Sequence, residues 1–472
     1  MTASYYTRRN FLKAVGLGAA AVGMPVSLLA AGRKRPNVLF IAVDDLRPQL
    51  GCYGHKQMLS PKIDRLASQG VTFLRSYCQV PVCGASRASL LTGVRPTKDR
   101  FLGFDTWAEK DLPGALSVAK HFRSNGYHTI SNGKVFHHAP DCKDGWSEEP
   151  WRPKGEWRNY LREENIKLAQ SNPGQAGPAY EAADVPDNAY FDGMIADKGI
   201  SDLRRLKGMD APFFLAMGFL KPHLPFNAPK KYWDMYKREE IDLADNPFRP
   251  KGAPDAALHT WGELRAYHGL PKKGPLPDEM ARTLIHGYYA CVSYTDAQIG
   301  KVLAELDRLK LRDNTVVVLW GDHGWNLGEH GLWCKHCNFE TSLHSPLIVT
   351  APGVKRGLKS NALTEYIDIY PSLCELCDLP LPSHLQGRSF VPLLKNPNLP
   401  WKNAVFSRYF AGDSVKTDRY RYTEWRRKDG AMSARMLYDH SVDWVENINI
   451  SELPENAELV SKLSAMIQGL KD

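Results

Sequence analysis

The sequence lacks several features that would assign it to a membrane, nucleic-acid-binding or disordered class. Beyond the first thirty residues, no hydrophobic run approaches the roughly 18 residues that a membrane-spanning helix needs, so we expect no stable membrane span. There is no basic stripe with interleaved aromatic residues and no nucleic-acid-reading motif, which argues against a nucleic-acid partner. Internal repeats are also absent, so a repeated unit does not account for the length.

What is present fits a large globular protein. At 472 residues the chain is long enough for one large domain and a smaller one. A content of 43% hydrophobic and 24% charged residues excludes a disordered or fibrous chain. The net charge is +9, from 61 Lys+Arg against 52 Asp+Glu, and part of the excess lies near the N-terminus. The remaining mild excess suits an anionic substrate.

The N-terminal segment has the pattern of an export signal. Residues 7–13 read Thr-Arg-Arg-Asn-Phe-Leu-Lys, and the stretch from Ala14 to Ala31 is weakly apolar and rich in Ala and Gly. Paired arginines ahead of such a stretch are typical of twin-arginine signals. We therefore expect residues 1–32 to be a signal peptide for the twin-arginine translocase, and the mature chain to be periplasmic or extracellular.

Nine cysteines occur in a chain expected to enter an oxidising compartment, where disulfides are allowed. Two Cys-x-x-Cys pairs, Cys334/Cys337 and Cys374/Cys377, suggest a four-cysteine zinc site. The gap between the pairs is well beyond the usual spacing for such a site. The sequence does not decide which cysteines pair with one another.

Continuous apolar runs predict strands that are buried on both faces of a parallel sheet. The runs are Asn37 to Val43, Phe213 to Gly218 and Thr315 to Trp320. Asp44 and Asp45 follow the first run, and Asp322 and His323 follow the last. Because ligands of open α/β sheets bind beyond the carboxyl ends of the strands, these four residues are candidates for a site. Helical periodicity between the runs, as in Val292 to Leu309, completes an α/β pattern.

Two long segments, residues 143–187 and 226–280, are rich in Pro, Gly, Trp and charge and have weak periodicity. We expect them to be long functional loops.

The chain after residue 395 has a different pattern. A linker-like stretch at residues 395–400 precedes strand-like pieces and a terminal helix near residues 457–470. We therefore predict a main domain over residues 36–395 and a small α+β subdomain over residues 396–472.

The most specific segment begins at Cys83. It reads Cys-Gly-Ala-Ser-Arg-Ala-Ser-Leu-Leu-Thr-Gly, behind a strand that ends in two aspartates and ahead of Gly-Asp-His-Gly. A cysteine alone would be better interpreted as a buried residue at the start of a helix. The whole combination resembles the signature of the type I sulfatase family, in which a Cys followed at two and four positions by Pro or Ala and by Arg is oxidised to formylglycine.

The resemblance implies both a fold and a chemistry. The fold is α/β and alkaline-phosphatase-like, a mixed, mostly parallel sheet flanked by helices, with a smaller C-terminal α+β domain. In the chemistry, the aldehyde made from Cys83 is hydrated, and one of its hydroxyls attacks the sulfur of a sulfate ester and expels the alcohol. The other hydroxyl then loses its proton, which re-forms the aldehyde and releases sulfate.

Asp44, Asp45 and Asp322 offer hard carboxylate oxygens, which suit calcium or magnesium better than zinc. Strand-end acids can also simply cap the turn that follows them. In the family these positions hold one calcium ion, together with the modified residue at position 83. His323 stands where many members have Asn, and it matches the iduronate-2-sulfatase branch. The implied metal ligands are therefore Asp44, Asp45, Cys83, Asp322 and His323.

Further segments match the same branch in order. A Gly-Lys-Val-Phe-His segment carries over Lys134 and His137 as contacts to the sulfate and the leaving oxygen. Lys-Pro-His-Leu-Pro-Phe carries over His223, and Gly-Glu-His-Gly-Leu-Trp-Cys-Lys ends in an active-site lysine, Lys335. Arg87, inside the signature, is expected to hold the formylglycine oxygen and the metal-binding carboxylates.

The sequence thus predicts a sulfatase that acts on sulfated polysaccharide or oligosaccharide, with a 2-O-sulfated uronic acid as the candidate sugar. Choline sulfate, aryl sulfates and other sugar positions stay open. So do a phosphodiesterase or phosphonate hydrolase of the same superfamily, and an inactive exported glycan-binding protein. A maturation enzyme is an implied partner. Position 85 is Ala where the animal enzymes carry Pro, which leaves open which maturation enzyme acts on Cys83. The two candidates are the oxygen-dependent generator and the anaerobic radical enzyme.

Overall fold

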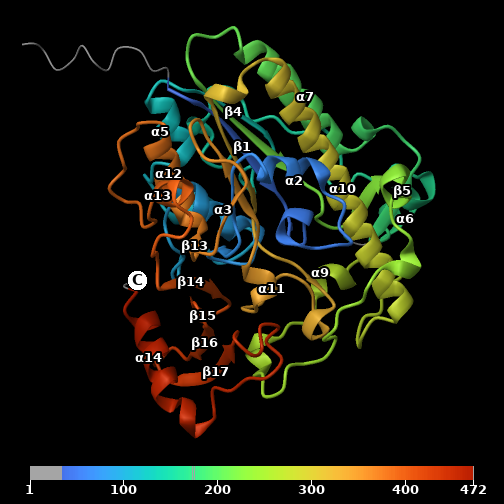
Figure 1. The fold of residues 1–472 in the computed structure, drawn as a ribbon. Coiled ribbons are helices and arrows are strands. Elements are labelled where there is room, and N and C mark those ends of the chain that lie inside the picture. Colours follow the sequence, from blue (N-terminus) through green and yellow to red (C-terminus); the bar gives the residue numbers. More distant parts are fainter. Residues whose placement is uncertain (1–34, 173, 175, 471–472) are drawn as a thin grey trace, which may run out of the picture. The chain divides into compact units, whose positions relative to one another are not determined.

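The computed structural model describes residues 35–172, 174 and 176–470 (Figure 1). The predicted signal peptide, residues 1–32, lies outside the described residues and stays a prediction. The chain from Pro36 onward forms one compact unit. Among the described residues, no helix combines the length and the apolar character that a membrane crossing requires.

A seven-stranded sheet forms the centre of this unit, in the order β12-β2-β11-β8-β1-β6-β4. Its strands are β1 (Asn37–Val43), β2 (Val71–Phe73), β4 (His128–Gly133), β6 (Phe213–Phe219), β8 (Thr315–Gly321), β11 (Leu347–Thr350) and β12 (Leu358–Ser360). β1 runs parallel to β6 and β8, and β4 runs parallel to β6, whereas β11 is antiparallel to β8 and β2. The mixed, mostly parallel sheet confirms the predicted fold class.

The three apolar runs form three adjacent interior strands, β8, β1 and β6. Each of these strands is buried along its whole length, which explains why the sequence shows continuous apolar runs rather than alternation. The register pairs Val43, the last residue of β1, with Gly321 of β8 and with Phe219 of β6. The residues that follow these strands therefore emerge side by side at one edge of the sheet.

Helices cover both faces of the sheet. One face carries α2 (Pro61–Ala67), α7 (Phe191–Leu206) and α10 (Asp278–Arg308), and Figure 1 shows α7 and α10 side by side. The other face carries α3 (Cys83–Thr92), α5 (Val118–Ser124) and α12 (Ile369–Leu376). The side chains of β1 alternate between the two cores, with Leu39 and Ile41 in the first and Val38 and Phe40 in the second.

Helix α10 is longer than predicted. The periodicity predicts a helix over Val292 to Leu309, whereas the structure begins it at Asp278. All residues from Thr283 to Tyr294 are buried, polar ones included, so this half of the helix has no amphipathic stripe that the sequence could reveal.

The two segments predicted as long loops contain short elements. These are η3 (Lys143–Gly145), α6 (Glu163–Ser171), β5 (Tyr180–Ala183), η5 (Asp187–Ala189), β7 (Phe226–Pro229), α8 (Lys230–Trp233), η6 (Arg238–Glu240), η7 (Asp255–Ala257) and α9 (Gly262–Arg265). β5 and β7 pair in parallel and so join the two segments. Elements of this length carry too few residues for a periodic pattern, which is why the sequence indicated loops.

The remaining short elements connect the larger ones. They are η2 (Gly51–Tyr53), β3 (Ser76–Tyr77), α4 (Ala108–Asp111), η8 (Arg312–Asn314), β9 (Asn326–Leu327), η9 (Glu329–Gly331), β10 (Trp333–Cys334), α11 (Glu340–Leu343), β13 (Thr364–Glu365), η10 (Tyr366–Asp368), α13 (Val391–Lys395) and η11 (Pro454–Asn456). All nine cysteines are free of disulfides.

The C-terminal part forms a second sheet, which is antiparallel. Its strands follow one another in chain order as β14 (Ala404–Tyr409), β15 (Gly412–Thr417), β16 (Tyr420–Arg426) and β17 (Met432–Asp439). Helix α14 (Ala457–Gln468) packs on this sheet through Val460, Leu463 and Ile467. The α+β character of this part is confirmed, and the boundary between residues 395 and 396 stays a prediction.

A buried ion-pair network joins the C-terminal sheet to the rest of the unit. Arg421 of β16 contacts Glu340 of α11, and its Nε lies 2.9 Å from Oε1 of Glu446. The other oxygen of Glu446 accepts a hydrogen bond of 2.7 Å from the backbone N–H of Glu340. Arg421 and Glu446 are almost fully buried, so each charge depends on the other for compensation.

Candidate active site

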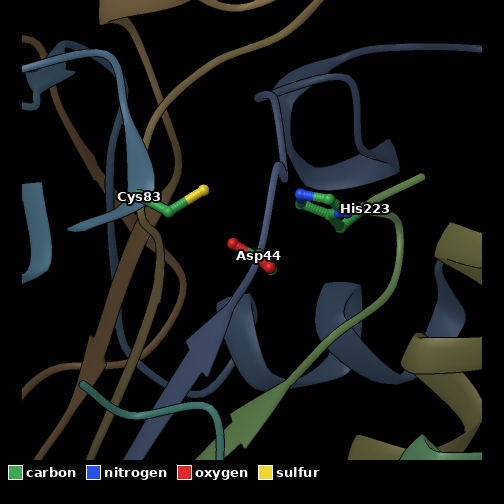
Figure 2. Close-up of side chains that lie close together, drawn as sticks. All are labelled: Asp44, Cys83 and His223. Atoms are coloured by element: carbon green, nitrogen blue, oxygen red, sulfur yellow. The ribbon is translucent and has the colours of Figure 1, made fainter. Parts of the chain in front are cut away.

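The residues singled out from the sequence lie together at the carboxyl edge of the central sheet. Asp44 and Asp45 directly follow β1, and Asp322 and His323 directly follow β8. In Figure 2 the side chains of Asp44, Cys83 and His223 come from three separate segments and face a common space. One polar atom from each of these three lies within 4.8 Å of the others.

Cys83 is the first residue of α3 and is 2% exposed. Its Sγ lies 3.3 Å from Nε2 of His323 and 3.8 Å from Oδ1 of Asp45. Burial, reinforced by the negative charge of Asp44, raises the pKa of the Cys83 thiol well above its usual value. The unmodified side chain is therefore a neutral thiol rather than a thiolate nucleophile.

The residue after Cys83 has to be small. A Cβ on Gly84 would lie 2.1 Å from the carbonyl oxygen of Phe104. The backbone of residues 103–104 thus packs directly on the turn that carries Cys83.

Four of the predicted metal ligands surround the Cys83 thiol and are 0 to 1% exposed. Nε2 of His323 lies 3.4 Å from Oδ1 of Asp45 and 3.6 Å from Oδ1 of Asp322. The backbone N–H of Asp45 donates to the same oxygen of Asp322 at 2.9 Å. Nδ1 of His323 donates to the carbonyl of Gly324 at 2.9 Å, which leaves the lone pair of Nε2 on the side of the carboxylates.

This donor set fits a hard divalent cation. Ligand atoms that share one calcium ion at its usual bond length are at most about 5 Å apart. One ligand atom each from Asp45, Cys83 and His323 lie within 4.8 Å of one another. Carboxylate oxygens predominate, which favours calcium or magnesium over softer metals. Whether these residues bind an ion, and which one, stays a prediction.

Arg87 holds three strand ends together and is completely buried. Its Nε donates to Oδ2 of Asp322 at 2.9 Å, and one terminal nitrogen donates to Oδ1 of Asp44 at 3.2 Å. The other terminal nitrogen donates to the carbonyl oxygens of Lys134 and Val135, just beyond β4. Arg87 thereby fixes the orientation of two of the carboxylates, as its place in the motif predicts.

Two lysines from distant parts of the sequence contact the two aspartates that follow β1. Nζ of Lys134 lies 2.5 Å from Oδ2 of Asp44, and Nζ of Lys335 lies 3.2 Å from each carboxylate oxygen of Asp45. Burial opposes a charge on both lysines. The neighbouring carboxylates nevertheless raise the pKa of Lys134 and of Lys335 above its usual value, so both stay cationic.

His223 lies in a tightly held loop after β6. The carboxylate of Asp192 accepts hydrogen bonds from the backbone N–H groups of Leu220 and Lys221 at 2.8 and 2.9 Å. Nζ of the buried Lys221 donates to the carbonyl oxygens of His223 and Pro225 at 2.9 and 2.6 Å. The loop is thus fixed from both ends, and with it the backbone that carries the His223 ring.

The ring of His223 has an acceptor on each nitrogen. Nδ1 is 2.6 Å from the carbonyl oxygen of Leu224, and Nε2 is 3.2 Å from Oε1 of Glu263. Nε2 also lies 3.8 Å from Oδ2 of Asp45. An acceptor oxygen therefore faces each ring nitrogen.

Glu263 of α9 belongs to this cluster and was not predicted. Its Oε1 accepts from Nζ of Lys335 at 2.9 Å in addition to its contact with His223. Burial opposes its charge, but the positive charges of Lys335 and His223 lower the pKa of Glu263 well below its usual value. Glu263 lies in a segment without periodicity, and no motif marks it, so the sequence carried no signal for it.

His137 lies at the margin of the cluster. Burial, with the charge of Lys134, lowers the pKa of His137 to about 2, so the ring is neutral. Its Nδ1 is buried and has no hydrogen-bond partner among the described residues. A buried polar atom without a partner in the protein calls for an explanation, and a ligand of the neighbouring cluster is one.

The arrangement can hold a divalent cation on three carboxylates and an anion between two lysines, with residue 83 at the helix start between them. The structure brings all the predicted site residues to this one edge of the sheet. Their individual roles stay predictions.

Comparison with known proteins agrees with the geometry. The family model described as Sulfatase matches residues 36–379, and the model described as N-sulphoglucosamine sulphohydrolase, C-terminal, matches residues 328–472. The iduronate 2-sulfatase of Mus musculus is 35% identical over 395 residues, covering 75% of this chain and 71% of the relative. The iduronate 2-sulfatase of Homo sapiens is 33% identical over 470 residues, covering 82% and 84%.

Solved structures share the fold. A protein in complex with its substrate D-glucosamine-2-N,6-O-disulfate aligns with a TM-score of 0.72 at 21% identity, covering 92% of this chain and 97% of that chain. The phosphonate monoester hydrolase of Agrobacterium radiobacter aligns with a TM-score of 0.76 at 22% identity, covering 92% and 95%. At these identities the likeness concerns the fold alone. The family models and the iduronate 2-sulfatases go further: the chain belongs to the sulfatase family of sulfuric ester hydrolases.

Proposed function

We propose that this sulfuric ester hydrolase removes sulfate from sulfated carbohydrate, using a formylglycine made from Cys83 and one calcium ion. The observation that carries the proposal is the position of Cys83, with Sγ 3.3 Å from His323 and 3.8 Å from Asp45. A cysteine kept as a neutral thiol in such a cluster has no evident structural use. A modified residue at the same position would face both the metal ligands and the lysines.

The residues that would hold the ion are Asp44, Asp45, Asp322 and His323, together with residue 83. When bound, calcium supplies positive charge that stabilises the negative charge of the sulfate group. Formylglycine supplies a hydrated aldehyde, which acts as a nucleophile without the need for a thiolate. Arg87 keeps the carboxylates of Asp44 and Asp322 oriented through two charge-assisted hydrogen bonds.

The lysines bind the sulfate oxygens. Lys134 and Lys335 keep their charge, and each is tied to a different aspartate after β1. Their ammonium groups therefore face the anion from two directions and neutralise charge that grows on its oxygens as the ester bond breaks.

The histidines serve the leaving oxygen. Nε2 of His223 faces Oε1 of Glu263 at 3.2 Å, and in the protonated form of the ring it gives its proton to the oxygen of the departing alcohol. His137 is neutral, and we assign it to the leaving oxygen because its Nδ1 has no partner among the described residues.

The sugar substrate is inferred from relatives. Both relatives compared above are named for removal of a 2-sulfate from iduronate, and one aligned protein was solved with a sulfated glucosamine as substrate. A 2-O-sulfated uronic acid is therefore the first candidate for this chain. The further partners that we propose are a maturation enzyme for Cys83 and the twin-arginine translocase, which would deliver the protein to the periplasm or beyond.

The proposal is tested on protein purified from its native export route. Peptide mass spectrometry should find Cys83 converted from CH2–SH to CHO, and the protein should release sulfate from at least one of a panel of defined sulfated disaccharides. Cys83→Ala is the blank for turnover. If protein in which Cys83 is fully converted to formylglycine released sulfate from none of the sulfated sugars, the proposal would be contradicted.

The alternatives give different results in the same experiment. A phosphodiesterase or phosphonate hydrolase would turn over bis-(4-nitrophenyl) phosphate or a phosphonate monoester faster than any sulfate ester. An inactive glycan-binding protein would carry an unmodified thiol at position 83 and still bind a sulfated glycan in calorimetry.

A further inference from the structure

Aromatic side chains are exposed around the active site. Six aromatic residues are strongly exposed among the described residues, namely Phe104, Trp157, Tyr180, Phe248, Phe410 and Trp444. Single exposed apolar residues are ordinary on a protein surface. Two of these six, Phe104 and Trp157, make ring contacts with a histidine of the active site. A third, Phe410, contacts Tyr409, whose ring contacts His336.

Phe104 stands beside residue 83 and His137. It is 64% exposed, and its ring centroid is 6.2 Å from that of His137. Its carbonyl oxygen occupies the space that a Cβ on Gly84 would need. The exposed ring is therefore attached to backbone that packs directly on the start of α3.

Trp157 stands beside His223. It is 41% exposed and lies in one of the segments predicted as functional loops. Its ring meets that of His223 edge to face at a centroid distance of 5.5 Å. The guanidinium of Arg158 lies 4.4 Å from the centroid of the Trp157 ring and holds it in place.

Phe410 belongs to the C-terminal sheet. It is 82% exposed at the tip of the β14–β15 hairpin, where Tyr409 pairs with Gly412. The two turn residues, Phe410 and Ala411, have φ of 46° and 63°, a left-handed conformation that usually falls to Asn and Gly. A large apolar residue in a strained turn is unusual, and such strain tends to occur at functional sites.

The hairpin tip is tied to the residues around Lys335. The ring of Tyr409 is 6.2 Å from Phe410 and 5.9 Å from His336, centroid to centroid. The side-chain nitrogen of Asn338 donates to the carbonyl of Tyr409 at 3.2 Å. Nδ1 of His336 lies 3.9 Å from Glu263, so the tip borders the Glu263 side of the cluster.

We propose that Phe104, Trp157 and Phe410 form an aromatic rim that binds the sugar rings next to the one that carries the sulfate. The substrate is then a sulfated oligosaccharide or the end of a polysaccharide chain, rather than a small sulfate ester. This inference rests on the proposed function. It adds a binding site outside the charged cluster, from three segments far apart in sequence.

The chemistry of a sulfated sugar chain explains why the charged cluster and the aromatic rim bind different parts of it. Charged groups of the inner cluster suit a sulfate ester, which is an anion. Neighbouring sugar rings offer apolar C–H faces with polar edges, and flat aromatic rings pack against such faces while the hydroxyls stay in water. Phe104 borders His137, Trp157 borders His223, and Phe410 is connected to His336 through the ring of Tyr409, so the rim residues approach the cluster from three different segments.

The test measures dependence on chain length. Mono-, di- and tetrasaccharides that end in the same 2-O-sulfated iduronic acid are compared by kcat/KM. For the unaltered enzyme we expect kcat/KM to rise at least about tenfold from mono- to tetrasaccharide, the equivalent of one or two stacking contacts. Phe104→Ala, Trp157→Ala and Phe410→Ala should each remove about three- to tenfold of that gain.

Matched controls separate stacking from general damage. Trp444→Ala truncates an aromatic side chain that is 71% exposed after β17, and it should keep the full gain. Phe410→Tyr retains a ring at the same place and should keep most of it. Circular dichroism and thermal melting of each variant establish that it is folded.

Any of three results would overturn the proposed rim. One is a kcat/KM that does not depend on chain length in the unaltered enzyme. The others are an equal loss on mono- and tetrasaccharide in all three variants, and a matching loss in Trp444→Ala. Failure of the proposed function looks different, because formylglycine-bearing enzyme would then release no sulfate from any of these sugars.

Discussion

Single residues in the site form ion pairs with oppositely charged neighbours. Asp44 is shared by Arg87 and Lys134, and Asp45 is contacted by Lys335 and His223. Because all of these side chains are largely buried, removal of one charge leaves its partner without compensation. The effects of substitutions should therefore extend beyond the altered residue.

Glu263 offers a sharp test at this scale. We expect Glu263→Gln to lower kcat/KM on a sulfated sugar about tenfold, because His223 and Lys335 lose a charged acceptor that fixes their positions. Inorganic sulfate should at the same time inhibit more strongly, since a negative charge beside the anion site has been removed. Steady-state kinetics with sulfate as inhibitor measures both.

A merely structural role of Glu263 would weaken turnover and sulfate inhibition together, which would contradict this prediction. Glu279→Gln is the control, because Glu279 is 75% exposed at the start of α10. It should change neither parameter.

Gly84 tests the fit around residue 83. Its Cβ would lie 2.1 Å from the Phe104 carbonyl, so Gly84→Ala should displace backbone on one side of the site and destabilise the fold by about 1–3 kcal/mol. Activity should fall at least about tenfold, because catalysis is sensitive to small displacements of the reacting group. Thermal melting, kinetics and the mass of residue 83 are measured together.

Gly208→Ala is the matched control for Gly84→Ala. A Cβ on Gly208 would have ordinary contact, 3.6 Å from the carbonyl oxygen of Arg205. Near-normal activity of Gly84→Ala with fully converted Cys83 would show that the contact with Phe104 is unimportant.

At the scale of elements, the sequence predicts the strands that are buried on both faces, because their residues are uniformly apolar. β1, β6 and β8 are buried on both faces and appear as continuous apolar runs, and their carboxyl ends locate the acids of the site. β15 and β17 have no continuous apolar run, because polar residues interrupt their pattern, and the sequence alone does not predict them. The residues carried by motifs were found, whereas Glu263 on the four-residue helix α9 was not.

Asp187 shows how the long segments are attached to the core. This residue of η5 accepts from Nζ of Lys231 on α8 and from Nζ of Lys301 on α10, each at 2.6 Å. Burial opposes its charge, but hydrogen bonds from Lys231 and Lys301 lower the pKa of Asp187 to about 2. An unfolded aspartate titrates near pH 3.9, so on acidification the unfolded chain takes up the proton first.

Asp187→Asn should therefore lower the free energy of unfolding by about 1–2 kcal/mol at neutral pH. The stabilisation is fully present above the unfolded pKa and is lost as the pH falls towards the folded value, so about half of the difference should be gone at pH 3. Urea unfolding of both proteins at pH 7, 5 and 3 measures this. A difference that stays constant over that range would contradict it.

At the scale of the whole molecule, the two sheets depend on each other through Arg421. Arg421→Met should lower the free energy of unfolding by about 3–5 kcal/mol, because Glu340 and Glu446 would keep buried charges without their partner. Arg419→Met is the control, since Arg419 is 54% exposed in its pair with Asp439 and should cost at most about 1 kcal/mol. Chemical denaturation of both variants gives the comparison, and similar costs would contradict it.

The proposed ion should also stabilise the whole fold. An ion that binds only the folded chain raises its stability in proportion to the logarithm of its concentration. Removal of calcium with EGTA should therefore lower Tm and abolish sulfate release, and calcium should restore both. Scanning calorimetry with calcium and with magnesium identifies the ion, and full recovery with magnesium alone would contradict the assignment to calcium.

The burial of Cys83 limits when the side chain can be modified. A side chain 2% exposed at the base of α3, with the backbone of Phe104 against the next residue, offers no room for another enzyme to grasp it. The proposed conversion to formylglycine would therefore have to be completed before this part of the chain folds. Twin-arginine translocation carries folded proteins, so on the proposed export route oxidation would come before folding, and folding before export. If the chain folded before Cys83 was oxidised, the exported protein would be folded but would keep the thiol and remain inactive.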